Sequence, residues 1–363
     1  MLNICFTFDY EIFFGKNYGT SEEILFKPTQ KIIDLLNEEK VSATFFIDTC
    51  SVMQNMKLDK YEYVNKVEEQ LRYMVKKGQD PQLHLHPHWL KSYFHNGEWT
   101  FNADFYRIHK FGFDELKHDS AYNLIKFGKD FLEKNICTID KEYKCIAFRA
   151  GGFTIQPHQE LVGVLYKNGI RIDSSIAPML LSNGVNAYDF RKKLNNVNWW
   201  LSAKEPWNVE AKDKKIALFE IPVGTENKNV FFFLIKRILK PRSIKLDKGE
   251  LKGTYIKADL NPKRRNRIIN IWNYITCYNA LSLDAYQADY LYHQIKRFYK
   301  KNKCQWKDAS IALIGHPKLA NDAYLDNLYR LICLLKKDET IRLTNIVQAY
   351  KKLGEKDDIY KKV

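Results

Sequence analysis

Hydrophobic positions in this chain fall into short apolar runs that alternate with longer stretches of helical periodicity. Runs of this length, rich in Ile, Val and Phe and bounded by polar residues, predict buried strands. Stretch 29–39 follows Pro28 and repeats apolar residues at helical spacing, which predicts a helix packed on the sheet. The predicted strands are 3–8, 41–47, 82–86, 144–148, 170–174, 216–222 and 310–314. Further helices are predicted at 60–77, 158–167, 284–301, 321–336 and 343–353.

This order of elements is typical of an α/β fold with a parallel sheet, either a barrel or an open sheet. Two stretches, 89–117 and about 223–282, are too long for simple connections. We interpret the second as a loop insertion on one face, because the strand pattern resumes after it. The expectation is therefore a single barrel-like domain spanning 1–363, with long loop insertions and C-terminal helices at about 321–355.

Polar and titratable residues lie at the ends of five predicted strands. Parallel α/β barrels and sheets place the carboxyl ends of their strands on one rim, where ligands bind. Residues far apart in the sequence should therefore meet there. They are Asp9 and Glu11 at the first strand, His84, His86 and His88 at the third, Arg149 at the fourth, Asp173 at the fifth and His316 at the seventh.

Three histidines in the sequence His-Leu-His-Pro-His, together with a carboxylate, indicate a site for a divalent transition metal such as zinc. Two nitrogen ligands of one ion lie no more than about 4 Å apart, whereas residues four apart in an extended strand are separated by about 13 Å. His84 and His88 can share an ion only if the chain turns after the strand, and Pro87 suits the first position of such a turn. If the strand stays extended, His86 and His88 lie on one face and are the ligands.

A divalent ion acidifies a bound water and polarises a carbonyl, so hydrolysis is the expected chemistry. Hydrolysis also needs a base for the water, an acid for the leaving group and stabilisation of charge. Asp9 or Glu11 is the candidate base, and His316 is the candidate acid. Arg149 can orient a carboxylate through paired hydrogen bonds and keep it ionised.

Composition bears mainly on the choice of partner. The 363 residues carry a formal net charge of +15, which favours anionic or lipid-linked glycans and peripheral contact with a membrane face. No nucleic-acid-binding motif accompanies the charge, so we expect no specific nucleic-acid binding. No apolar run is long enough for a transmembrane helix, and no secretory signal is recognisable. The seven cysteines contain no Cys-x-x-Cys pair, and we expect a cytoplasmic protein with reduced thiols.

Short motifs occur in a characteristic order between residues 3 and 320. They are FTFDYE at 6–11, ATFF at 43–46, a His-x-x-x-His spacing at 84–88, FRAG at 148–151, DSS at 173–175, FEIP at 219–222 and IGHP at 314–317. In this order they resemble the polysaccharide deacetylase family, also called the NodB-homology or carbohydrate esterase family 4 group, and most closely its lipopolysaccharide-biosynthesis branch. The sequence departs from the usual family pattern in two motifs: Asp-Tyr-Glu replaces Asp-Asp, and Arg-Ala-Gly-Gly replaces Arg-x-Pro-Tyr.

The resemblance implies a distorted (β/α)7 barrel and a divalent metal ion held by one carboxylate and two histidines. Carried onto this chain, the implied metal ligands are Glu11, His84 and His88, which leaves His86 outside the set. Zinc is the expected ion.

For catalysis, the resemblance implies Asp9 as the base, Arg149 as the residue that positions Asp9, and His316 as the acid that protonates the leaving amine. Asp173 would tune His316. The expected activity is removal of an N-acetyl group from an amino sugar during assembly of a surface polysaccharide or lipopolysaccharide. The alternatives are a deformylase or another amide hydrolase acting on a lipid-linked sugar, and a catalytically silent protein that binds a glycan or a biosynthetic partner.

Overall fold

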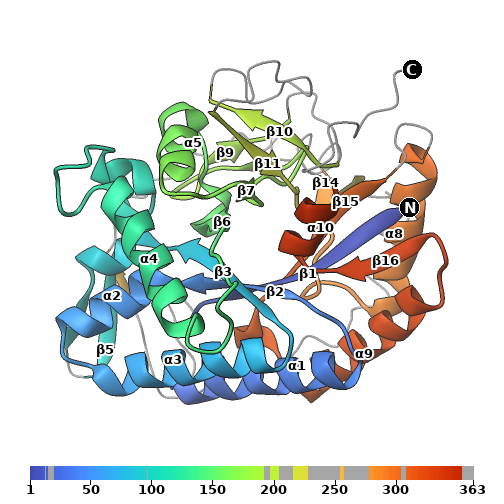
Figure 1. Cartoon of the computed structure of the whole chain (residues 1–363), viewed down its shortest axis with the longest axis horizontal. Coiled ribbons are helices and arrows are strands. Elements are labelled where there is room, and N and C mark those ends of the chain that lie inside the picture. Colours follow the sequence, from blue (N-terminus) through green and yellow to red (C-terminus); the bar gives the residue numbers. More distant parts are fainter. Residues whose placement is uncertain are drawn as a thin grey trace.

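The alternation of strands and helices predicted from the sequence is present as a curled, mostly parallel sheet with helices around its outer face (Figure 1). The computed structural model describes residues 1–12, 14, 20–95, 97–191, 197–203, 216–227, 254–256, 278–303 and 308–353. Most of the insertion predicted at about 223–282 therefore lies outside the described residues.

All the predicted strands are confirmed, and they pair in parallel in the order β11-β7-β6-β3-β2-β1-β15. Their bounds are β1 (Leu2–Tyr10), β2 (Thr44–Asp48), β3 (Asp80–Leu85), β6 (Ala147–Ala150), β7 (Ile172–Asp173), β11 (Ala217–Glu220) and β15 (Ala309–Gly315). β10 (Trp199–Ser202) runs antiparallel to β11, and β16 (Ile341–Thr344) pairs with the first half of β1. A bridge between Val223, just after β11, and Ala312 of β15 joins the two ends of this series. The fold is thus the barrel-like α/β arrangement expected from the sequence.

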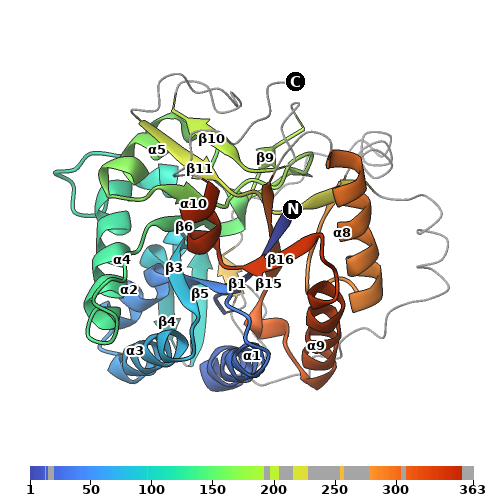
Figure 2. The ribbon, with the colours of Figure 1, turned by 45° about the vertical axis from the view of Figure 1, so that its right-hand side comes forward.

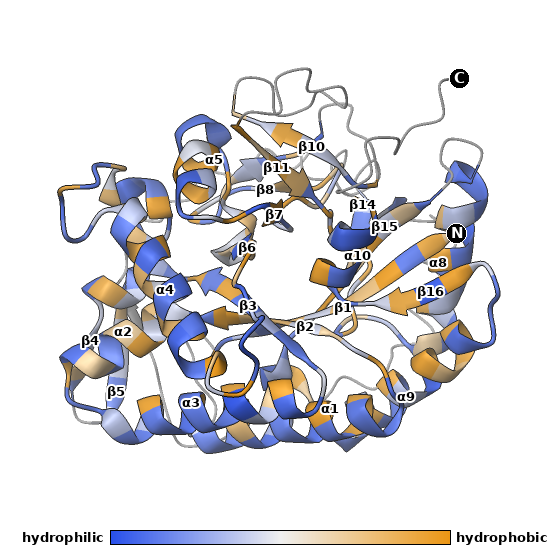
Figure 3. Cartoon of the chain, viewed as in Figure 1, coloured by the Kyte–Doolittle hydropathy of each residue, from blue (hydrophilic) through white to orange (hydrophobic). Residues whose placement is uncertain are grey.

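Amphipathic helices cover the outside of the sheet (Figures 1 and 2). They are α1 (Lys27–Glu38), α2 (Thr49–Lys57), α3 (Tyr61–Lys76), α4 (Ala121–Ile136), α5 (His158–Lys167), α8 (Ala288–Asn302) and α9 (Asp322–Lys336). In α1, Pro28 lies in the first turn and the buried side chains include Ile32, Ile33 and Leu36, as the helical spacing predicts. Figure 3 shows this alternation of polar and apolar positions on the outer helices. No helix in the described part of the chain is long and apolar enough to cross a membrane.

Helix α10 (Ile346–Leu353) closes the amino end of the barrel. Ile346, Ala349 and Leu353 pack into one buried cluster with side chains from alternate strand positions, among them Cys5 and Phe46. The backbone N–H of Ile346 donates to Thr44 at the start of β2, at 3.0 Å. This plug fills the amino end and leaves the carboxyl end of the strands for a site.

The first long stretch noted in the sequence, 89–117, forms a hairpin and short helical turns beside that carboxyl end. The hairpin consists of β4 (Tyr93–His95) and β5 (Glu98–Asn102), and β13 (Thr254–Ile256) pairs with β5. The remaining short strands are β8 (Leu181–Ser182), β9 (Tyr188–Asp189), β12 (Thr225–Asn227) and β14 (Tyr278–Ala280). The short helical turns are η1 (Glu22–Phe26), η2 (Pro87–Lys91), η3 (Ala103–Phe105), η4 (Ile108–Phe111), η5 (Gly151–Phe153) and η7 (Pro317–Leu319).

Candidate active site and metal centre

The carboxyl end of β1 places two carboxylates on the same side of the chain. Asp9 lies near the end of the strand and Glu11 follows two positions later, so alternation along the extended backbone directs both side chains to one face. Both residues are buried. A buried carboxylate is costly unless a cation or several donors compensate it, so the neighbours of each one define its role.

Arg149, at the end of β6, compensates Asp9. Its Nη1 donates to Asp9 Oδ1 at 2.7 Å and to Thr7 Oγ1 at 2.9 Å, while Nε and Nη2 donate to the carbonyl and hydroxyl of Ser174. Burial alone would raise the pKa of Asp9, but Arg149, with His84 and His316, holds that pKa below its usual range. The pair expected from the sequence is therefore in contact, and Oδ2 of Asp9 remains directed toward His316, whose Nε2 is 3.7 Å away.

Glu11 forms a buried cluster with His84 and His86 in which one ligand atom from each lies within 4.8 Å of the others. Oε2 of Glu11 is 3.2 Å from Nε2 of His84 and also contacts Nε2 of His86. Burial alone would raise the pKa of Glu11, but Lys318 and the two imidazoles hold it well below its usual range. One carboxylate oxygen and two imidazole nitrogens form a ligand set typical of zinc.

The hydrogen bonds of His84 test whether this cluster fits a metal ion. Nδ1 of His84 lies 2.7 Å from the carbonyl oxygen of Arg149, which can only accept, so Nδ1 carries a proton. In the neutral ring, Nε2 then turns a lone pair toward the oxygen of Glu11, and only a proton or a cation between them makes this contact favourable. Burial lowers the pKa of His84, but Asp9 and Glu11 raise it above its usual value, as expected where a proton takes the place of a cation. The donor set therefore fits a divalent ion, with the carbonyl of Arg149 orienting the ring.

His88 lies in a different place from the one that the resemblance implied. The turn predicted at Pro87 is present, since η2 begins there. The turn directs His88 onto Tyr106, whose ring is nearly parallel to its own at a centroid distance of 5.1 Å. Burial, together with the charge of His86, holds the pKa of His88 well below its usual value. The structure therefore groups His84 and His86, two residues apart on one face, with Glu11, whereas both pairs weighed from the sequence included His88.

The unusual Gly-Gly pair after Arg149 accommodates this arrangement. A β-carbon on Gly151 would lie 2.6 Å from the carbonyl oxygen of Leu85 and 2.7 Å from the ring of His86, and one on Gly152 would meet the hydroxyl of Tyr106. Gly152 also has a φ of 57°, which favours glycine. The departure from the family pattern in this motif leaves room for His86 and for Tyr106.

His316, after β15, is oriented by Asp284 and not by Asp173. Its Nδ1 lies 2.7 Å from Oδ2 of Asp284, and its backbone N–H donates to Oδ1 of the same carboxylate at 2.9 Å. Burial lowers the pKa of His316, but the charge of Asp284 and its hydrogen bond raise it above the usual value. The sequence expectation that Asp173 tunes His316 is corrected: a carboxylate from the segment before α8, which pairs with β15 through Ser282, takes that place.

Asp173 belongs instead to a buried polar group beneath the site. It accepts a hydrogen bond from the hydroxyl of Ser175 at 2.6 Å and is hydrogen-bonded to Glu220. Burial and the neighbouring Asp173 raise the pKa of Glu220 well above its usual value, and burial also raises the pKa of Asp173, so the two carboxyl groups are suited to share a proton. Ser175 in turn accepts from the backbone N–H of Ala150 at 2.8 Å, which ties this pair to the strand carrying Arg149.

Lys318 is a further residue of the site that the sequence did not reveal. Its Nζ donates to Oε1 of Glu11 at 2.5 Å and to the carbonyl of Ile12 at 3.2 Å. Because Lys318 holds Oε1, the other oxygen, Oε2, faces His84 and His86. In the sequence, the one indication that Lys318 belongs to the site is its position two residues after His316, which the structure places in the turn η7.

Comparison with known proteins supports the fold. The sequence matches no family model and no curated protein. Among solved structures, a probable polysaccharide deacetylase from Pseudomonas aeruginosa PAO1 is similar over 98% of this chain and 92% of its own, with 11% identity and a TM-score of 0.51. The PuuE allantoinase is similar over 98% of this chain and 91% of its own, with 12% identity and a TM-score of 0.50. This chain has the polysaccharide deacetylase fold.

The packing around Gly151 leads to a first prediction. Gly151→Ala forces a methyl group against the His86 ring and the Leu85 carbonyl, and we expect it to destabilise the protein by about 1–3 kcal/mol and to weaken zinc binding. Gly163→Ala is the matched control, because a β-carbon there meets nothing within 4 Å and alanine favours the helix by up to about 1 kcal/mol. Denaturant unfolding and zinc titration measure both effects. Equal behaviour of the two variants would show that Gly151 does not set the place of His86.

The contact between His316 and Asp284 leads to a second prediction. Asp284→Asn removes the negative charge beside the ring, so burial should dominate and the pKa of His316 should fall. Asp173→Asn is the comparison variant and should leave that pKa much less changed. Histidine NMR spectra recorded across a pH series measure the pKa directly. A larger fall in Asp173→Asn than in Asp284→Asn would restore the original assignment.

Proposed function

We propose that this chain is a metal-dependent hydrolase that removes an N-acyl group, in the first instance N-acetyl, from an amino sugar. The observation that carries the proposal is the convergence of three units at one strand end: the cluster of Glu11, His84 and His86, the carboxylate Asp9, and the imidazole His316. Each unit supplies one requirement of amide hydrolysis: a metal site, a base and an acid.

Glu11, His84 and His86 would hold the ion, for which zinc fits the donor set. When bound there, a divalent ion acidifies water and polarises the acyl carbonyl. Lys318 keeps one oxygen of Glu11 engaged and so directs the other toward the two imidazoles.

Asp9 is suited to accept the proton of the attacking water. Arg149 fixes one of its oxygens, and the resulting low pKa keeps the carboxylate ionised at neutral pH. The second oxygen lies 3.7 Å from Nε2 of His316. A carboxylate held in this way needs no rearrangement before it receives the proton.

His316 is suited to protonate the leaving amine. Asp284 accepts from Nδ1, so the proton for the amine is carried on Nε2, which lies 3.7 Å from both Asp9 and Glu11. The pKa of His316, raised by Asp284, favours retention of that proton. The proposed acid and base therefore lie beside one another, with Nε2 of His316 3.7 Å from Oδ2 of Asp9.

An amino sugar is the proposed substrate class because a polysaccharide deacetylase is among the structures of this fold and the ordered motifs resemble that family. Because a structure of the same fold is an allantoinase, the acyl group that is released and the molecule that bears it need a direct test. Surface polysaccharide or lipopolysaccharide assembly, in the cytoplasm, is the proposed setting. The net charge of +15 suits an anionic or lipid-linked carrier.

A direct test measures acetate and formate release from N-acetylated and N-formylated glucosamine oligomers by zinc-loaded protein. We expect acetate release that is abolished by chelation and restored by zinc. Asp9→Asn should retain zinc and lose about 100-fold or more in rate, because it removes the proton acceptor and leaves the ligands intact.

Two results would contradict the proposal. A protein that binds no stoichiometric divalent metal after reconstitution would favour a silent glycan-binding role. An Asp9→Asn variant with unchanged activity would exclude Asp9 as the base. Formate release without acetate release would keep the mechanism and change the substrate to an N-formyl sugar.

A further inference from the structure

Asp48 lies next to the cluster of metal-type ligands, and three buried N–H groups converge on its carboxylate. It is the last residue of β2, pairs with His84 of β3 in the sheet and is 2% exposed. Its Oδ1 accepts from the backbone N–H of His86 at 3.0 Å and from that of Cys50 at 3.3 Å. Its Oδ2 accepts from the indole N–H of Trp89 at 2.7 Å. The proposed chemistry makes no use of this carboxylate.

Capping of a helix accounts for only one of these three bonds. Asp48 is the N-cap of α2, and its capping bond to Cys50 is the longest of the three. Asn and Ser serve as N-caps about as well as Asp. A carboxylate, however, accepts through both of its oxygens, whereas an Asn would turn its NH2 group toward His86 or Trp89. The two shorter bonds are therefore what an aspartate provides here and another N-cap residue does not.

The two shorter bonds bridge the turn that carries the histidines. The backbone N–H of Trp89 donates to the carbonyl of His86 at 3.1 Å and closes the turn. Asp48 holds the same two residues through the backbone N–H of one and the indole of the other. Fixing the N–H of His86 fixes the plane of the preceding peptide. The observed φ of −111° then places the ring of His86 against Glu11, which its Nε2 contacts.

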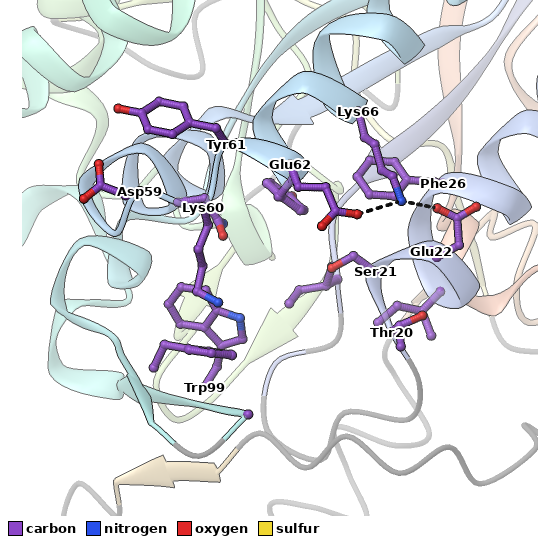
Figure 4. A pocket seen from close by; sticks show the side chains of 16 residues that line it. Thr20, Ser21, Glu22, Phe26, Asp59, Lys60, Tyr61, Glu62, Lys66 and Trp99 are labelled. Atoms are coloured by element: carbon purple, nitrogen blue, oxygen red, sulfur yellow. Dashed lines mark hydrogen bonds and ion pairs between the residues drawn. The ribbon is translucent and has the colours of Figure 1, made fainter.

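Trp89 is a rigid partner for this bond. Its ring packs edge-on against Trp99 at 4.7 Å and against Phe101 at 4.9 Å. Trp99 lines a cavity of about 720 Å³ (Figure 4), whereas Trp89 is only 1% exposed. An indole N–H buried in this way needs an acceptor within the protein, and Asp48 is that acceptor.

The far end of the turn is also fastened to α2. Nε2 of Gln54 donates to the carbonyl of Ser92 at 3.1 Å, and the hydroxyl of Ser92 donates to the carbonyl of Trp89 at 2.6 Å. Helix α2 therefore holds the segment 86–92 at two points, through Asp48 at its N-terminus and through Gln54 further along.

In this arrangement His88 packs away from Glu11. Its ring lies among three aromatic rings, at centroid distances of 4.5 Å from Phe14, 5.2 Å from Phe101 and 5.1 Å from Tyr106. Bringing His88 to Glu11 would require the turn to leave the carboxylate of Asp48.

We infer that Asp48 is a positioning residue that holds this turn so that His86, and not His88, faces Glu11. The inference rests on the proposed function for the identity of the cluster as a metal site. It adds a residue that lies outside the ordered motifs of the sequence, two positions after the ATFF motif at 43–46.

The test is a double-mutant cycle on zinc affinity, measured on the full chain by competition with chromophoric chelators. Asp48→Asn keeps the size of the side chain and turns an NH2 group toward one partner. Zinc affinity should fall by about 10- to 100-fold, the usual effect of losing an outer-shell partner. In the His86→Ala background the same substitution should change the affinity by less than about threefold, because its effect passes through His86.

Ser120→Ala is the matched control. Ser120 is the buried N-cap of the neighbouring helix α4 and accepts from the backbone N–H of Asn123 at 3.3 Å, the length of the capping bond of Asp48. Loss of a cap should lower the free energy of unfolding in both Ser120→Ala and Asp48→Asn, as measured with denaturant. Only Asp48→Asn should also lose zinc affinity.

Trp89→Phe is a second variant, which carries the test if Asp48→Asn does not fold. It keeps the buried ring and the carboxylate of Asp48 and removes only the indole donor. Zinc binding should weaken in the native background and stay unchanged in the His86→Ala background. Equal losses with and without His86 would show that Asp48 acts through its charge or through general stability, and would overturn the inference. Native-like zinc affinity in both Asp48→Asn and Trp89→Phe would also overturn it.

Acetate release, measured in parallel, separates this inference from the proposed function. Coupling between Asp48 and His86 in zinc binding, in a protein that releases no acyl group, supports the role of Asp48 and contradicts the hydrolase. Acetate release by a protein whose zinc affinity does not depend on Asp48 overturns the inference alone.

Discussion

Two buried carboxylates at the end of β1 impose the main constraint on this protein. A charge removed from water costs several kcal/mol unless a cation or strong donors are placed beside it. Asp9 meets this requirement through Arg149, and Glu11 meets it through Lys318 and two imidazoles. The sheet supplies these partners, because parallel pairing brings the ends of β3, β6 and β15 around β1. The proposed chemistry depends on the same neighbouring groups, because the positive charges that stabilise the two buried carboxylates also keep them ionised.

Much of this arrangement follows from sequence pattern alone. Short apolar runs predict the strands. The rule that ligands lie at the carboxyl ends of parallel strands predicts from the sequence alone that Asp9 and Arg149 lie close together. Asp284 and Lys318 could not be found in that way. Asp284 reaches His316 only because its segment pairs with β15 through a single bridge, and Lys318 depends on the direction of one short turn. Long-range pairing and local turn geometry leave no periodic signal in the sequence.

The His-Leu-His-Pro-His stretch also shows that local backbone geometry cannot be predicted from the sequence pattern. The sequence correctly predicted a turn at Pro87, and from it the inference that His84 and His88 could share an ion. Which histidine faces Glu11 depends on the backbone of the residue where the strand ends, and His86 keeps an extended-like φ of −111° there. Gly151 gives the ring of His86 its space. The departure from the family pattern in that motif therefore leaves room for the His86 ring in the cluster with Glu11 and His84.

The most direct test of this account is the zinc affinity of three single variants, His84→Ala, His86→Ala and His88→Ala, measured by competition with a chromophoric chelator. The account predicts that His84→Ala and His86→Ala lose more than the roughly 10- to 100-fold in affinity that removal of an outer-shell partner costs, while His88→Ala stays within a few-fold of the native protein. Loss of zinc in His88→Ala with retention in His86→Ala would contradict the cluster of Glu11, His84 and His86 and restore the ligand set implied by the family resemblance.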